Sequence, residues 1–161
     1  MDDTFLFYHA LIQKYLKGDE VMSSMKVRPV VSKKNNYHIS KHRFYELKHY
    51  CLQYDEWVDE LRELDGGFRS TSVITIDDAP IDDPVLNHVE RKTELEEKIE
   101  IIHKCAKKAD RELWTYIVNA VTKDLSFTEL KMLYKIPRGK NQYYESYRRF
   151  FFILSQEKHT F

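Results

Sequence analysis

The stretch that decides the fold is residues 126–157, SFTELKMLYKIPRGKNQYYESYRRFFFILSQE. It opens with Ser126-Phe127-Thr128-Glu129, a capping box, in which the serine hydroxyl and the glutamate carboxylate each accept one unpaired backbone amide at a helix start. The short helix that follows is predicted to break at Ile136-Pro137-Arg138-Gly139, because proline and glycine interrupt helices. A last helix is predicted from about Lys140 to Glu157.

The predicted last helix has two different faces. Aromatic and apolar side chains fall within one arc of a helical wheel: Tyr143, Tyr144, Tyr147, Phe150, Phe151 and Leu154. Polar side chains fall opposite or at the margins: Asn141, Gln142, Glu145, Arg148 and Arg149. A buried face opposite a polar face is what a recognition helix in the DNA major groove requires. With the preceding helix, capped by Asp110, residues 109–161 are predicted to form a trihelical helix-turn-helix domain.

The two ends of the predicted last helix differ in the partners they suit. Arg138 and Lys140, at the turn and at the positive end of the helix, suit contacts to phosphate. Phe152 and Ile153 lie on the outward side, so the distal half of the helix is expected to meet another element or another subunit. Only its first half would then read DNA. Trihelical units also occur in proteins that never touch DNA, so a purely structural role stays open.

Helical spacing extends to the N-terminal region, residues 1–65. Residues 4–17 place apolar side chains on one face, namely Phe5, Tyr8, Leu11, Ile12, Tyr15 and Leu16. A second helix is predicted to start at Ser40 and to run unbroken to Gly66, because apolar residues from Phe44 to Leu61 are three or four positions apart. Residues 66–83, rich in Gly, Pro and Asp, are predicted to be a linker.

A long charged helix is predicted over residues 84–108. Asp83 would cap it and Pro84 would occupy its first turn. One face holds Leu95, Ile99, Ile102 and Ala106, while most residues between 90 and 100 are charged. The apolar stripe would dock either on the rest of the chain or on a second copy, and we expect a homodimer through the long helices. The predicted fold class is therefore all-α.

Composition narrows the class of protein. The chain has 161 residues and a hydrophobic fraction of 42%, enough for the core of one ordinary domain. It has no apolar run of about 18 residues, so no membrane span is expected. The acidic start, Met1-Asp2-Asp3, is unlike a signal peptide. Cys51 and Cys105, each within a predicted helix, are interpreted as reduced buried thiols rather than a disulfide. We therefore expect a cytoplasmic protein.

Charge is unevenly distributed although the formal net charge is zero. Basic residues dominate between 26 and 49 and again between 131 and 161, and acidic residues dominate between 53 and 100. Either basic segment could contact nucleic acid. The alternative is that the segments neutralise one another in the fold. The 26–49 segment could equally bind a protein.

The sequence contains no clear metal-binding or catalytic motif. His38 and His42 are four residues apart, but His38 precedes the predicted cap Ser40, so a metal site is disfavoured. No phosphate-binding loop, nucleophile elbow or CxxC motif is present. We therefore expect no enzymatic activity, no cofactor and no metal. Trp57 and Trp114 are expected to be core or interface residues.

The motif from Ile136 to Leu154, IPRGKNQYYESYRRFFFIL, resembles the C-terminal motif of small regulators from phages and prophages of Gram-positive bacteria. The upstream runs Ser40–Lys48 and Gln53–Trp57 resemble the N-terminal motif of the same proteins. The chain is similar to the ArpU, RinA and LtrC-like regulators of phage late transcription, whose C-terminal part resembles region 4 of a sigma factor. The two motifs cover about a third of the chain.

The resemblance implies sequence-specific binding to double-stranded DNA in a bacterial host cell, with RNA polymerase as a further candidate partner. It points to six DNA-binding residues: Arg138, Lys140, Asn141, Gln142, Arg148 and Arg149. Glu145 departs from the pattern, because a carboxylate on that face repels phosphate. The competing hypothesis is a non-enzymatic adaptor or inhibitor that binds a protein and uses the helical module as a scaffold.

Overall fold

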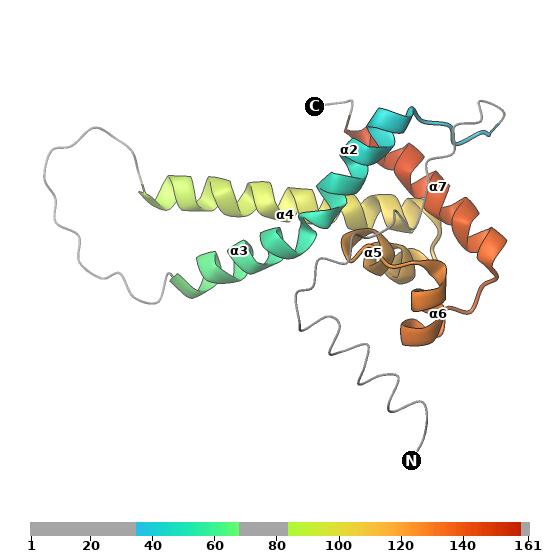
Figure 1. Cartoon of the computed structure of the whole chain (residues 1–161). Helices are drawn as coiled ribbons and strands as arrows, with labels where there is room; N and C mark the ends of the chain where they lie inside the picture. Colours follow the sequence, from blue (N-terminus) through green and yellow to red (C-terminus); the bar gives the residue numbers. More distant parts are fainter. Residues whose placement is uncertain (1–34, 68–83, 159–161) are drawn as a thin grey trace, which may run out of the picture.

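The computed structural model describes residues 35–67 and 84–158, and every regular element in these two ranges is a helix (Figure 1). The helices are α2 (Lys41–Leu52), α3 (Tyr54–Gly67), α4 (Pro84–Ala109), α5 (Trp114–Thr122), α6 (Phe127–Tyr134) and α7 (Lys140–Glu157). The all-α prediction is thus confirmed for this part of the chain. The helix predicted at 4–17, the cap Asp83 and most of the linker lie outside the described residues.

The long helix α4 is the element around which the others are arranged. It packs against α3, α5 and α7, and in Figure 1 it runs from beside α3 into the group formed by α2, α5 and α7. Leu95, Ile102 and Ala106 are buried along it, which confirms the predicted apolar face. That face is therefore covered by the same chain. No helix in the described ranges is both long enough and apolar enough to cross a membrane.

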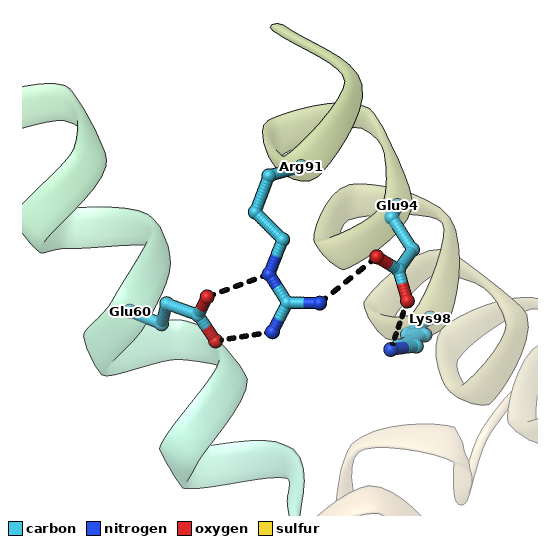
Figure 2. A network of polar contacts seen from close by, with 4 residues as sticks. All are labelled: Glu60, Arg91, Glu94 and Lys98. Carbon is cyan, nitrogen blue, oxygen red and sulfur yellow. Dashed lines mark hydrogen bonds and ion pairs between the residues drawn. The ribbon is translucent and has the colours of Figure 1, made fainter. Parts of the chain in front are cut away.

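Helix α3 and the first half of α4 lie side by side and form what we call the arm (Figure 1). Arg91 on α4 joins Glu60 on α3 through two hydrogen bonds of 2.6 and 2.8 Å, and also bonds to Glu94 at 2.9 Å (Figure 2). Lys98 continues the network to Glu94 at 2.5 Å. Such exposed pairs each stabilise little, so they mainly fix how the two helices align.

The prediction of one unbroken helix from Ser40 to Gly66 is wrong. The helix ends at Leu52 and a new one starts at Tyr54, because Gln53 turns the chain with its amide bonded back to the carbonyl of Tyr50 at 3.3 Å. The cause is tertiary: α2 packs against α5 and α7, whereas α3 packs along α4. One straight helix could not bury its apolar stripe against both partners.

Aromatic side chains of α7 fill the centre of the core. Tyr143, Tyr147, Phe150, Phe151 and Leu154 are all buried, as the helical wheel predicts. The ring of Phe44 on α2 lies 4.8 Å from that of Phe151, between centroids. Phe152, on the outward side, has its ring centroid 5.9 Å from that of Tyr37. The distal half of α7 therefore meets another segment of the same chain, which was one of the two expectations.

Part of the basic segment 26–49 is neutralised inside the fold. Lys48 is buried and its ammonium lies 2.8 Å from the carboxylate of Asp124. Arg43 bonds to Glu46 at 2.6 Å and donates to the hydroxyl and carbonyl oxygens of Ser155. These two cations hold α2 against α7 and against the segment between α5 and α6. They are not available to a nucleic acid without breaking those contacts.

The two cysteines are free thiols, and both are buried. Burial raises the pKa of Cys105 to about 12, and it also raises the pKa of Cys51. Both thiols therefore stay protonated near neutral pH and behave as small apolar side chains. The expectation of reduced, buried thiols is confirmed.

Candidate nucleic-acid interface

Helix α6 starts with a closed set of hydrogen bonds. The hydroxyl of Ser126 accepts the amide of Glu129 at 3.4 Å, and the carboxylate of Glu129 accepts the amide of Ser126 at 2.7 Å. This is the predicted capping box. At the other end, Lys135 adopts the left-handed conformation with φ 52°, and the chain then turns toward α7. Helix α6 thus has little capacity to bind a ligand at its N-terminus.

Helix α7 starts in a different way. Its N-cap is Gly139, which offers no side chain, and its first turn contains no acidic residue. The first amides of an α-helix have no partner within the helix, so here they remain directed at whatever lies in front of it. The positive end of the helix dipole lies at the same place. Amides and dipole together favour an anion, such as a DNA phosphate.

The predicted reading residues lie together at this open end. Lys140, Asn141 and Gln142 form the first turn of α7 and are exposed. Arg149 is also exposed, and it lies seven residues beyond Gln142, which places both on one face two turns apart. None of these four side chains bonds to another residue in the ranges 35–67 and 84–158. The face can therefore meet an external partner without losing internal contacts.

Arg138 is beside this face but is already paired. Its guanidinium bonds to the carboxylate of Glu112, in the loop between α4 and α5. The pairing brings that loop next to the turn between α6 and α7. Arg111, the neighbour of Glu112 in the sequence, is exposed. Sequence reasoning missed Glu112, because its contact with Arg138 joins residues 26 positions apart.

Asp110 connects the same loop to α7. Its carboxylate accepts the amides of Glu112 and Leu113 at 2.9 and 3.1 Å, and the hydroxyl of Ser146 at 2.8 Å. Partial burial raises the pKa of Asp110, but the bonds from Ser146 and the two amides outweigh it, so the pKa lies below its ordinary value. The predicted cap of the following helix is wrong, because the N-cap of α5 is Leu113, without a side-chain hydrogen bond, and Asp110 instead caps the turn at residues 111–113 that precedes α5. In addition, the ionised carboxylate fixes the first half of α7 relative to α5.

Arg148 does not share the exposed face. It lines a polar pocket of about 260 Å³ together with Asn35, Asn36, Tyr37 and Glu145. Its Nε is buried and makes no hydrogen bond within the described part of the chain. The structure thus brings together Lys140, Asn141, Gln142 and Arg149, keeps Arg138 adjacent, and turns Arg148 toward the 35–37 segment.

The charge of the face is mixed. Arg138, Lys140 and Arg149 are basic, whereas Glu112 and Glu145 are acidic and exposed. The balance is positive, but Glu112 offsets Arg138 directly. Among the residues described, no group of three or more His, Cys, Asp or Glu side chains is arranged to hold a metal ion.

Comparison of the chain with models of protein families, with curated proteins and with solved structures gave no match in any of the three.

Proposed function

We propose that this protein is a sequence-specific DNA-binding transcription regulator of phage type, and that α7 is its recognition helix. The observation that supports this best is the open N-terminus of α7, with Lys140, Asn141 and Gln142 exposed and without internal partners. The aromatic core behind it holds the helix at a fixed angle. The phage assignment rests on the resemblance of the two sequence motifs.

In the proposed complex, different residues have different tasks. The uncapped amides of α7, Lys140 and Arg111 bind phosphates and set the register on the duplex. Asn141 and Gln142 can each make paired hydrogen bonds to an adenine, and Arg149 can do so to a guanine. Arg138 would join the phosphate contacts only after it leaves Glu112.

A homodimer would place two copies of α7 on two half-sites of one operator. The end of the arm offers exposed apolar side chains for a protein contact, since Leu86 and Val89 are 54% and 52% exposed. We therefore also propose a dimer, with RNA polymerase as a further partner. A footprint with twofold symmetry would support the dimer.

The test is a fluorescence titration of the full chain against genomic fragments from its own source, at two salt concentrations. Lys140→Ala should weaken binding to all fragments and lower the salt slope by roughly 0.9. Arg149→Ala should cost about 1–3 kcal/mol on the preferred fragment and relax the preference. Arg62→Ala is the matched control, because this exposed arginine pairs with Asp59 on the arm, away from α7.

Saturable, salt-sensitive binding to one fragment would support the regulator. Equal weak binding to every fragment, or the same loss for Arg62→Ala as for Lys140→Ala, would contradict sequence-specific recognition by α7. The protein-binding adaptor would then be the better hypothesis, and Leu86 and Val89 would be the first residues to substitute.

A further inference from the structure

The polar pocket beside Arg148 contains two opposite charges that are not paired with each other. Its volume is about 260 Å³, and it is lined by Asn35, Asn36, Tyr37, Glu145 and Arg148. Glu145 and Arg148 are three positions apart on α7, but neither forms an ion pair within the ranges 35–67 and 84–158. The Nε of Arg148 is buried and has no hydrogen-bond partner there. A buried donor without a partner is destabilising, so the pocket favours a ligand that supplies an acceptor.

The wall of the pocket that faces α7 is a turn with its own hydrogen bonds. The side-chain oxygen of Asn35 accepts the amide of Tyr37 at 2.9 Å, and the carbonyl oxygen of Asn35 accepts the amide of His38 at 3.1 Å. The ring of Tyr37 lies 5.9 Å from that of Phe152, between centroids, and this contact holds the turn against α7. The pocket is therefore formed before a ligand binds, which lowers the entropic cost of binding.

The two charges limit the class of ligand. An anion alone would pair with Arg148 but would be repelled by Glu145, and a cation alone would meet the converse problem. An uncharged ligand would leave both charges without an ionic partner. A ligand that carries both an anionic and a cationic group satisfies both residues. Ligand pockets usually have volumes of about 300–1,000 Å³, and this pocket is smaller, so the ligand must be small.

We propose that this pocket binds a free α-amino acid in its zwitterionic form. The carboxylate of the ligand accepts paired hydrogen bonds from Nε and one terminal nitrogen of the Arg148 guanidinium, the arrangement in which arginine binds carboxylates most strongly. The ammonium of the ligand donates to the carboxylate of Glu145. The side-chain amides of Asn35 and Asn36 supply further donors and acceptors at the same pocket. The bound ligand thus links the 35–37 turn to α7.

Isothermal titration calorimetry of the full chain with each common amino acid, in the absence of DNA, tests this site independently of the proposed function. We expect saturable binding of at least one amino acid at millimolar concentrations. Arg148→Gln and Glu145→Gln should each lower its affinity about tenfold or more, because each removes a charged partner of the ligand. Arg62→Gln and Glu63→Gln, at exposed positions on the arm, are the matched controls and should leave the affinity unchanged.

Derivatives of the bound amino acid assign each contact. The N-acetyl derivative lacks the ammonium, so it should bind more weakly than the amino acid to the parent protein but about as well to Glu145→Gln. The amide derivative lacks the carboxylate and should behave in the same way toward Arg148→Gln. Non-additive losses of this kind show that the ligand group and the side chain contact each other.

Three results would overturn the proposal. The first is no saturable binding of any amino acid to the parent protein. The second is unchanged affinity in Arg148→Gln and Glu145→Gln when both variants keep the circular dichroism of the parent. The third is that the losses from the derivative and from the substitution simply add. Glu145 is exposed, so Glu145→Gln with the N-acetyl derivative decides the outcome if Arg148→Gln does not fold.

Discussion

Helices α6 and α7 follow one another in the chain, yet they begin in opposite ways. Helix α6 begins with Ser126 and Glu129, whose side chains satisfy two amides of the first turn. Helix α7 begins with Gly139, whose lack of a side chain leaves the corresponding amides uncapped. A helix with a glycine N-cap is less stable than one with a good side-chain cap by about a few tenths of a kcal/mol.

Nothing local forces this difference. Gly139 has φ −72° and ψ 159°, a conformation that any residue adopts, and no atom lies within 4 Å of the position a Cβ would take. A serine or an aspartate would therefore fit and would cap the helix. The start of α6 is thus stabilised by side-chain caps, whereas the start of α7 has uncapped amides, which under the proposed function would bind a phosphate.

Gly139→Asp should remove the difference between the two helix starts and have the largest effect of the variants considered. The carboxylate would cap α7 and occupy the anion site, so the free energy of unfolding should rise by a few tenths of a kcal/mol. DNA affinity should fall about fivefold or more, because a like charge about 4 Å from a phosphate costs roughly 1 kcal/mol even in water. Denaturant melts and fluorescence titrations measure the two effects.

Gly139→Asn separates capping from charge, because asparagine caps as well as aspartate does but is neutral. It should raise stability and weaken DNA binding less than Gly139→Asp. Unchanged DNA affinity in Gly139→Asp would show that the open end of α7 does not face phosphate.

Ser126→Ala should act on the other helix and in the other measurement. It removes one half of the capping box, so the free energy of unfolding should fall by about 1 kcal/mol. Affinity for DNA should stay unchanged under conditions where the variant is folded. Thr128→Ala, an exposed position in the same turn, is the control and should change stability little. A DNA defect in Ser126→Ala as large as in Gly139→Asp would erase the distinction between the two helices.

Glu112→Gln tests whether Arg138 can contribute to DNA binding once it has no acidic partner. It removes the carboxylate that pairs with Arg138, so this guanidinium becomes available to phosphate. We expect DNA affinity to rise up to about fivefold, equivalent to about 1 kcal/mol, with a steeper salt dependence. Glu63→Gln, an exposed glutamate on the arm, controls for the loss of one negative charge. Equal tightening in both variants would mean that only net charge matters.

The turn before α5 makes stability depend on pH. Asp110 accepts two amides in this turn, and its pKa is lower than that of an aspartate in an unfolded chain, which is about 3.9. Its contribution to stability is therefore present above pH 3.9 and is lost as the pH falls through the lower, folded pKa. Asp110→Asn should flatten the decline in stability below pH 4, measured by denaturant melts across pH. An unchanged decline would assign it to other carboxylates.

Local signals were sufficient for much of this fold. The capping box at Ser126 and the span of α7 involve residues within a few positions of one another, so sequence spacing alone predicts them. The break at Gln53 was not predictable in this way, because it results from two different packing partners. The same holds for Lys48, which belongs to a basic segment but is buried against Asp124.

The candidate site shows the same division. Exposure of Lys140, Asn141 and Gln142 follows from the helical wheel of α7. The pairing of Arg138 with Glu112 and the orientation of Arg148 toward Asn35 depend on contacts between distant parts of the chain. Helical periodicity identifies the face, but it does not show which of its charges are already neutralised.

The continuity of α4 has a consequence for how the molecule unfolds. One end of α4 pairs with α3 through Arg91 and Glu60. The other end pairs with α7 through Lys104 and Lys108, which both contact Glu157. Neither half can melt without fraying the helix that the other half shares. Trp57 lies in the arm and Trp114 in α5, so Trp57→Phe and Trp114→Phe each leave one tryptophan as a reporter, and both variants should show one cooperative transition at the same denaturant concentration as their helical circular dichroism.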